Sequence, residues 1–337
     1  MKNTREFYVL IIGYGKIGQI KAQIWKDFGA RIFVSDTSSK RINKAIDDGF
    51  CDNNKFRNKY DYIDICTPTN SHIETLLSVI SKQHDFKFIT VEKPLFNNQT
   101  DRDRLVELLN DAPSLSNRIV VNEQYYRSKA LMKLRNILSN KKIDRVEIEM
   151  SKNRIPDISE GRFIDDKIGV YGIELPHILA LLSSLGISVK NAEILSNKCF
   201  SACDDNQNCG VCIELLSRDT EIIARSFIGD FALSNNTTSL ISNAMTRKLV
   251  ITSNGDEHTL LFDPHPSMER LYSEIITPTE SITIYDNMLR SNINDIISNH
   301  IHSKCRIQSA IEQADLLMSF ANNSVTQSIS IKEGAIL

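Results

Sequence analysis

Three glycines near the start of the chain have the spacing that lets a backbone turn approach a phosphate. Gly13, Gly15 and Gly18 follow the apolar run 7–12 and open a segment with helical periodicity. Gly13 permits the tight turn, Gly15 lets the main chain reach a pyrophosphate, and Gly18 allows close helix–strand packing. The N–H groups at the helix start favour an anion. We therefore predict dinucleotide binding rather than a glycine-rich turn without a ligand. The predicted cofactor loop comprises Gly13, Tyr14, Gly15, Lys16, Ile17 and Gly18.

An acidic residue at the end of the next predicted strand, 31–36, indicates which dinucleotide is preferred. Asp36 lies where the ribose-binding acid of this motif is expected. A carboxylate there accepts hydrogen bonds from the ribose hydroxyls and repels a 2′-phosphate, which favours NAD. Lys40 and Arg41 follow closely and could accommodate that phosphate, but we interpret them as solvated helix residues. NAD is the predicted cofactor, and NADP is not excluded.

A polar loop follows another predicted strand, 62–66, at the same edge of the sheet. It contains Thr67, Pro68, Asn70 and His72. Pro68 can stiffen the loop against the nicotinamide, while Asn70 and His72 offer polar contacts. The structural alternative is a helix N-cap formed at this point.

The next predicted strand, 86–91, ends in Glu92, Lys93 and Pro94, and Glu92 and Lys93 are candidate cofactor contacts as well. Lysine at this rim can hold a substrate hydroxyl or donate a proton to a carbonyl. The proline restricts the backbone of Lys93 to extended conformations, which helps to aim its side chain. The alternative is an ordinary surface turn.

A histidine lies on an otherwise apolar predicted helix, 172–185. Glu174 precedes His177 by three residues, so the two share a helical face. A histidine in such a place is by default a satisfied core residue. The adjacent acid favours a functional role, because a buried carboxylate needs a partner or a task.

The elements that position these residues fall into two groups. Up to about residue 120, strands alternate with amphipathic helices, which predicts a parallel, doubly wound sheet of the Rossmann type with ligands at the strand carboxyl ends. Strand-length segments dominate 192–262, and helices occupy about 285–298 and 306–321. We predict an α/β protein with a dinucleotide-binding domain, 1–124, and an α+β substrate-binding and oligomerisation domain, 125–337.

Composition excludes several classes of function. The 337 residues carry a net charge of −2 with 24% charged residues, so there is no basic stripe for nucleic acid. No apolar stretch approaches the ~20 residues that span a bilayer. The first residues run directly into a strand and leave no room for a signal peptide. We expect a cytoplasmic protein that binds neither nucleic acid nor membranes.

Seven cysteines in a long chain fit reduced thiols better than a disulfide framework. Cys199, Cys203, Cys209 and Cys212 lie close together and could form a zinc knuckle, since thiolates are good zinc ligands. However, Cys199 and Cys212 fall in apolar stretches that resemble the arms of a hairpin. We interpret them as ordinary strand thiols and predict no metal site.

These elements together resemble the Gfo/Idh/MocA oxidoreductase family, which includes inositol dehydrogenase and glucose-fructose oxidoreductase. The resemblance covers nearly the whole chain. It implies a Rossmann domain, a C-terminal domain built on a large, mostly antiparallel sheet, and homodimers or homotetramers formed through that sheet. The matching segments are 13–18, 67–72, 92–94, the helix carrying His177, 284–289 and 309–314.

By position, the resemblance makes Lys93 the catalytic lysine and His177 the histidine near the reacting oxygen. The family commonly has Asp where this chain has Ile173, so Glu174 is the candidate for that acid role. Departures also occur just after the last strand of the first domain. The candidate substrate contacts there are Gln124, Tyr126 and Arg127.

The resulting hypothesis is an NAD(P)-dependent oxidoreductase. It transfers a hydride between nicotinamide and a carbinol or carbonyl carbon of a sugar, cyclitol or nucleotide-sugar-like small molecule. Lys93 and His177 are the acid/base groups, assisted by Glu174. The alternatives are a reductase of an imine or other unsaturated bond on the same fold, and a non-catalytic NAD-binding regulator.

Overall fold

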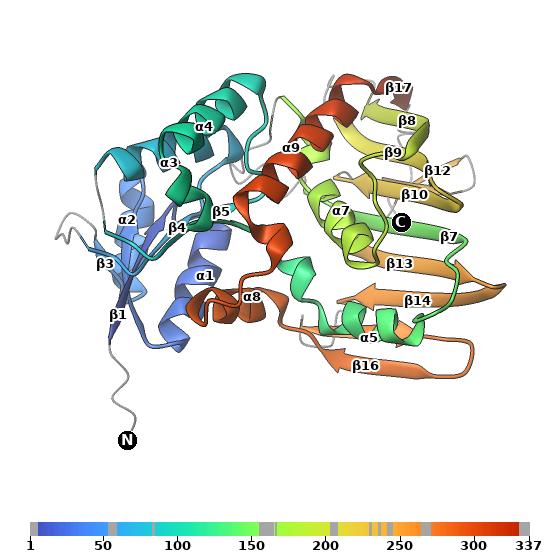
Figure 1. Ribbon diagram of the computed structural model, residues 1–337, viewed down its shortest axis with the longest axis horizontal. Coiled ribbons are helices and arrows are strands. Elements are labelled where there is room, and N and C mark those ends of the chain that lie inside the picture. Colours follow the sequence, from blue (N-terminus) through green and yellow to red (C-terminus); the bar gives the residue numbers. More distant parts are fainter. Residues whose placement is uncertain are drawn as a thin grey trace. The chain divides into compact units, whose positions relative to one another are not determined.

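The chain divides into two compact units. The first comprises Met1–Gln124 and Leu289–Ala314, and the second comprises Tyr125–Met288 and Asp315–Leu337. A computed structural model (Figure 1) gives both units. It describes residues 6–52, 59–82, 85–154, 165, 167–202, 208–228, 231–234, 237–240, 245–263 and 271–329.

A six-stranded parallel sheet forms the centre of the first unit, in the order β3-β2-β1-β4-β5-β6. Central strands carry almost continuous apolar runs; Val9, Ile11, Ile63 and Ile65 are fully buried. Such runs are expected where helices cover both faces of a parallel sheet. The strands are β1 Phe7–Ile12, β2 Ala30–Ser35, β3 Cys51–Asp52, β4 Tyr62–Ile65, β5 Phe88–Glu92 and β6 Ile119–Asn122.

Helices connect these strands, and Figure 1 shows α3 and α4 on one face of the sheet with α1 on the other. The strand order is that of two mononucleotide-binding halves, β1–β3 and β4–β6, which diverge from the centre of the sheet. The connecting helices are α1 Lys16–Asp27, α2 Ser39–Asp47, α3 His72–Ser81 and α4 Gln99–Asp111, with 3₁₀ turns at Thr69–Ser71, Pro113–Asn117 and Gln124–Arg127.

A nine-stranded sheet forms the second unit, in the order β16-β15-β14-β13-β7-β10-β9-β8-β17. Only β10 with β7 and β17 with β8 pair in parallel among these strands. The strands are β7 Arg145–Lys152, β8 Glu193–Ala202, β9 Asn208–Ser217, β10 Thr220–Phe227, β13 Met245–Ser253, β14 Asp256–Phe262, β15 Tyr272–Ile276, β16 Ser281–Tyr285 and β17 Val325–Ile329. A separate hairpin pairs β11 Phe231–Ser234 with β12 Thr237–Leu240.

One face of this large sheet is packed against helices, as its alternating pattern requires. Along β7, Val146, Ile148 and Met150 are buried, whereas Glu147 and Glu149 lie on the other face and are only partly buried. The buried side chains pack against α5, α7 and α9 in one apolar core. These helices are α5 Lys129–Ile137, α7 Leu175–Ser184, preceded by a 3₁₀ turn at Gly169–Gly172, and α9 Ile307–Asn322, which crosses the boundary between the units.

The predicted fold class is therefore confirmed: a doubly wound parallel sheet together with a large, mostly antiparallel sheet. The late helices differ from the prediction, first in where they pack. Helix α8, Met288–Ile297, packs on the first unit, where Asn292 donates a hydrogen bond to the side-chain oxygen of Asn122. A short 3₁₀ turn, Ser303–Cys305, follows it there. No local pattern in the sequence indicates this return.

The start of α8 also differs from the expected position near residue 285. Tyr285 ends strand β16, and Asp286 caps another helix instead of opening α8. Its carboxylate accepts hydrogen bonds from Ser128 Oγ at 2.6 Å and from the Lys129 N–H at 2.8 Å, at the start of α5. A carboxylate at a helix N-terminus satisfies N–H groups that lack intrahelical partners.

Candidate functional site

The glycine turn is held by contacts that only glycine permits. Gly13 has φ +94° and donates its N–H to Ser35 O at 2.8 Å. A Cβ on Gly13 would lie 2.8 Å from Cys66 O, and one on Gly18 would lie 2.1 Å from Gly13 O. The turn is therefore packed against both the end of β2 and the loop after β4.

Gly15 differs from Gly13 and Gly18 because none of the described residues fills the space beside its Cα. It is the N-cap of α1 and has no side chain to cap the first N–H groups, and the first turn contains no acidic residue. A Cβ built on Gly15 meets no atom of the described residues within 4 Å. Open space beside uncapped N–H groups fits a pyrophosphate.

Asp36 supports the turn and lies under an arginine. Its Oδ2 accepts the N–H of Tyr14 at 2.7 Å, and its Oδ1 accepts the N–H of Ser38 at 2.8 Å. Each carboxylate oxygen keeps a further lone pair for a ribose hydroxyl. Arg41 Nη1 lies 3.6 Å from Oδ2, so Arg41 is paired rather than simply solvated as expected. This pairing places a cation where a 2′-phosphate would be recognised.

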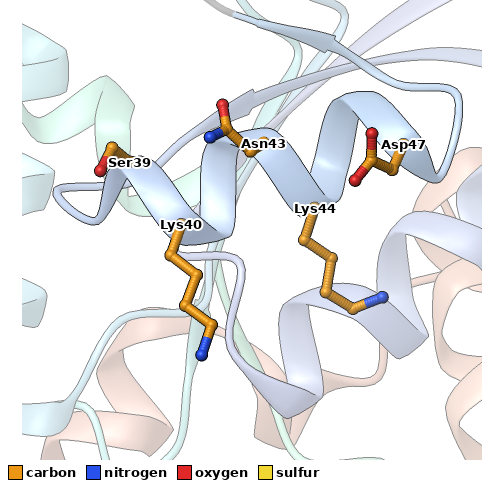
Figure 2. Close-up of a pocket in the computed structure, with 5 residues that line it drawn as sticks. All are labelled: Ser39, Lys40, Asn43, Lys44 and Asp47. Atoms are coloured by element: carbon orange, nitrogen blue, oxygen red, sulfur yellow. The ribbon is translucent and has the colours of Figure 1, made fainter.

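Lys40 has no comparable position. Figure 2 shows that Lys40 and Lys44 point to the same side of α2, along a surface hollow. Lys44 pairs with Asp48 at 3.2 Å. The hollow is lined by Ser39, Lys40, Asn43, Lys44 and Asp47.

The loop after β4 contributes one unsatisfied polar atom. Thr67 Oγ1 is buried without a hydrogen-bond partner among the residues that the structure describes. A buried hydroxyl of this kind is costly to leave unpaired, and it is available to a bound ligand. Pro68 and Asn70 in the same loop are exposed. The open cradle at Gly15 and this hydroxyl both fit the dinucleotide that the sequence predicts.

The sequence predicts that His72 contacts the cofactor, but in the structure its ring nitrogens lie against carbonyl groups of the protein. It is 1% exposed. Nδ1 lies 2.9 Å from Pro94 O, and Nε2 lies 2.8 Å from Thr67 O. Burial lowers the pKa of His72, although both carbonyl contacts oppose that shift. The imidazole therefore joins two loops of the protein.

The Glu92-Lys93-Pro94 segment leaves β5 from a buried polar network. Glu92 Oε1 accepts hydrogen bonds from Lys21 Nζ at 2.9 Å and from Asn122 Nδ2 at 2.6 Å. Lys93 is partly buried, the Lys93–Pro94 peptide is cis, and Pro94 is buried. Lys93 therefore directly follows Glu92, whose carboxylate is held by both Lys21 and Asn122.

The second unit contains the other predicted acid/base pair. Glu174 is the N-cap of α7, and its Oε2 lies 3.9 Å from His177 Nε2. The His177 ring stacks at an angle against Tyr125, with 4.7 Å between ring centroids, and Tyr125 meets Phe262 edge-on at 5.1 Å. The histidine is therefore held by an aromatic wall and a carboxylate.

Two arginines that the sequence analysis did not single out surround Glu174. Arg154 Nη2 donates to Glu174 Oε1, and Arg247 Nη2 lies 3.9 Å from Oε2. Arg247 also donates to Asp263 Oδ2 at 3.2 Å. Burial opposes the charge of Arg247, yet its surroundings, including the carboxylates of Glu174 and Asp263, raise its pKa. With its charge compensated in this way, Glu174 is better suited to orient His177 than to exchange protons.

Replacing Glu174 by Gln should lower the free energy of unfolding by about 3–5 kcal/mol, because it leaves the buried guanidinium group of Arg154 and the partly buried one of Arg247 without their shared carboxylate. Denaturant unfolding measures this change. Glu147→Gln is the matched control: Glu147 also pairs with two arginines, Arg145 and Arg225, but is partly exposed, and it should cost less than about 1 kcal/mol. Equal, small losses would contradict a structural role for Glu174.

The remaining candidate contacts lie on a single 3₁₀ turn. Gln124, Tyr126 and Arg127 are all partly buried. Gln124 ends the first unit and Tyr126 and Arg127 belong to the second.

Two of the four clustered cysteines have side chains in the described part of the chain, on neighbouring strands. Cys199 and Cys212 are buried on the paired strands β8 and β9, and burial raises the pKa of the Cys199 thiol to about 11. Cys203 and the side chain of Cys209 lie outside the described part of the chain. Within that part, no group of three or more His, Cys, Asp or Glu residues is arranged to hold a metal ion. The described helices include none that is long and apolar enough to cross a membrane.

Neither a protein-family model nor a curated protein sequence matches the chain, but solved structures share its fold. The UDP-N-acetylglucosamine 3-dehydrogenase GnnA from Acidithiobacillus ferrooxidans is 14% identical, with a TM-score of 0.67 over 93% of this chain and 96% of that chain. KijD10, a 3-ketoreductase from Actinomadura kijaniata in complex with NADP, is 12% identical, with a TM-score of 0.71 over 96% and 100%.

A dehydrogenase (MviM) from Clostridium difficile is similar to the same extent: it is 18% identical, with a TM-score of 0.64 over 94% of this chain and 99% of that chain. The likeness spans nearly the full length of all three enzymes. It confirms the two-domain fold that the sequence predicted.

Proposed function

We propose that this protein is an NAD(P)-dependent oxidoreductase that acts on a carbinol or carbonyl carbon of a sugar, cyclitol or nucleotide-sugar-like molecule. The observation that carries the proposal is the glycine turn, where Gly15 leaves open space beside the uncapped start of α1. The fold shared with a UDP-N-acetylglucosamine 3-dehydrogenase and a 3-ketoreductase supports the substrate class.

We assign the following roles to residues of the chain. The first N–H groups of α1 and the carboxylate of Asp36 bind and orient the dinucleotide, which when bound supplies or accepts the hydride. Lys93 as an ammonium group donates a proton to the substrate oxygen during reduction, and as an amine it accepts that proton during oxidation. His177, held by Glu174 and Tyr125, is the second proposed acid/base group.

Titration of the purified protein with NADH and NADPH tests this proposal. Binding in the micromolar range or tighter, followed by hydride transfer to or from a member of a panel of sugars, cyclitols and nucleotide sugars, is the expected result. Binding without turnover on the panel would favour the imine reductase or the NAD-binding regulator. Failure to bind either dinucleotide would overturn the oxidoreductase proposal.

Asp36→Ala should weaken NADH binding by at least about tenfold, because it removes a charged acceptor for two ribose hydroxyls. NADPH binding should weaken less, since its 2′-phosphate gains from the loss of the carboxylate. Fluorescence titration with each reduced dinucleotide measures both affinities. An equal loss for the two would contradict the ribose assignment.

Arg41→Ala should have the opposite selectivity. Arg41 lies 3.6 Å from Asp36, so its guanidinium group can pair with a 2′-phosphate. We expect NADPH affinity to fall about tenfold and NADH affinity to change little, measured by the same titrations. Lys40→Ala, on the hollow along α2, is the matched control and should alter neither.

We also propose that the protein forms a homodimer or homotetramer through its nine-stranded sheet, as the family resemblance implies. Light scattering coupled to size-exclusion chromatography tests the oligomeric state, and a monomer would overturn this part of the proposal.

A further inference from the structure

A network of buried charged and polar side chains joins α1 to the central strands of the parallel sheet. Lys21 Nζ lies 2.5 Å from Asp64 Oδ1 and 2.9 Å from Glu92 Oε1. Lys21 is 1% exposed and Asp64 is fully buried. Burying charges is expensive unless they are paired and hydrogen-bonded, so this arrangement needs an explanation.

The hydrogen bonds around both carboxylates are extensive. Asp64 also accepts from Trp25 Nε1 at 2.9 Å and from Thr90 Oγ1 at 2.5 Å. Glu92 accepts from Asn122 through the same oxygen that receives Lys21. The side chain of Glu92 is 14% exposed, so Glu92 is where the network reaches the rim of the sheet.

The network holds more negative than positive charge. Burial works against the ammonium group of Lys21, but Asp64 and Glu92 raise its pKa, so the lysine stays protonated. Burial raises the pKa of the adjacent Cys66 thiol well above its usual range, which keeps that thiol neutral. One cation therefore faces the two carboxylates of Asp64 and Glu92, and the excess charge is negative.

The sheet order indicates what this charge faces. In a doubly wound sheet of this order, each half binds one mononucleotide at the carboxyl ends of its strands. Asp36 follows β2 in the first half, where the adenosine ribose is recognised. Glu92 ends β5 in the second half, where the nicotinamide mononucleotide is therefore expected. The nicotinamide ring is cationic only in its oxidised form.

We infer that Glu92, fixed by Lys21 and Asn122, makes the cofactor site discriminate between the redox forms of the nicotinamide in favour of the oxidised, cationic form. The inference rests on the proposed function. A fixed negative charge at the rim attracts the oxidised ring and gains nothing from the neutral reduced ring. Other fixed charges near the ring, including that of Lys93, also enter the ratio of the two affinities, but they are the same in the wild type and in a Glu92 variant, so they largely cancel when the two ratios are compared.

The test is the ratio of NAD⁺ to NADH affinity, measured by calorimetry for the wild type and for Glu92→Gln. The variant keeps the size of the side chain and an oxygen that accepts from Lys21 and Asn122. We expect the ratio to shift toward NADH by about three- to tenfold. Asp36→Asn is the matched control: it also removes a carboxylate, but one that faces a ribose present in both forms, so both affinities should fall together.

Two further variants separate charge from packing. Thr90→Val removes one hydrogen bond to Asp64 without changing any charge and should leave the ratio unaltered. Lys21→Gln removes the cation and should not shift the ratio toward NADH. If Glu92→Gln does not fold, Glu92→Ala removes the same charge and must give the same shift.

The outcomes distinguish this inference from the proposed function. Absence of binding by the wild type would overturn the function itself. Normal binding with an unchanged ratio in the folded Glu92 variant would overturn only the inference. A shift toward NADH in Lys21→Gln equal to that in Glu92→Gln would also overturn it, because the integrity of the network rather than its charge would then set the ratio.

Discussion

Replacing Lys93 by Met should lower kcat by about two to four orders of magnitude, the usual contribution of a positioned general acid or base. Methionine keeps much of the length and the apolar stem of lysine but cannot carry the proton. NADH affinity should stay near that of the wild type, because the glycine turn and Asp36 make their contacts without Lys93. Steady-state kinetics on the substrate found by screening, together with NADH titration, measures both effects.

Two further variants sharpen this prediction. Lys93→Arg keeps the positive charge but cannot release a proton near neutral pH, so it should be almost as inactive as Lys93→Met. Lys87→Met, at a lysine that is 64% exposed just before β5, controls for the loss of a lysine as such and should retain full activity. Unchanged turnover in Lys93→Met would remove Lys93 from the proposed mechanism.

The parts of the site that were predictable are those encoded by short segments. The glycine turn, Asp36 and the Glu92-Lys93-Pro94 segment each depend on the type and spacing of neighbouring residues, and each follows a mostly apolar strand. Because parallel strands end at one edge of a sheet, their sequence positions alone predicted a common rim. The fold class followed from the same alternation of strands and helices.

Contacts between residues far apart in the sequence were not predictable. Lys21 pairs with Asp64 and Glu92 across 43 and 71 positions, and nothing around Lys21 distinguishes it from an exposed helix lysine. The same holds for Arg154 beside Glu174. A buried polar side chain is identified by its partner, and a single sequence does not give the pairing.

One unpredicted residue near Glu174, Arg247, could have been identified from the pattern of its strand. Arg247 lies on β13 in the same alternating register as Leu249 and Ile251, which are fully buried. The period of two therefore places Arg247 on the inward face of its strand, where an arginine requires a carboxylate partner. A search for charged residues at inward positions of amphipathic strands would have found it.

Gly15→Ala and Gly18→Ala should both abolish NADH binding, but for different physical reasons. A Cβ on Gly18 would lie 2.1 Å from Gly13 O, so the backbone of the turn must shift to admit it. Overpacking of this kind costs about 1–3 kcal/mol or more, and we expect a lower melting temperature together with loss of binding. Cofactor affinity then falls because the turn itself is distorted.

Gly15→Ala separates binding from folding. Gly15 has φ −75°, which alanine adopts without strain, and a Cβ there meets no atom of the described residues within 4 Å. The melting temperature should therefore be retained or slightly raised, because alanine restricts the unfolded chain. The methyl group would occupy the space that the pyrophosphate needs, so NADH affinity should fall by at least about a hundredfold.

Thermal unfolding and NADH titration of the two variants give the decisive comparison. A stable Gly15→Ala protein that no longer binds NADH would place the pyrophosphate on the start of α1, because no other consequence of one exposed methyl group explains such a loss. A stable variant with unchanged affinity would mean that the open space above Gly15 is not the cofactor cradle. In that case the glycines serve only the packing of α1 against the sheet, for which Gly13 and Gly18 suffice.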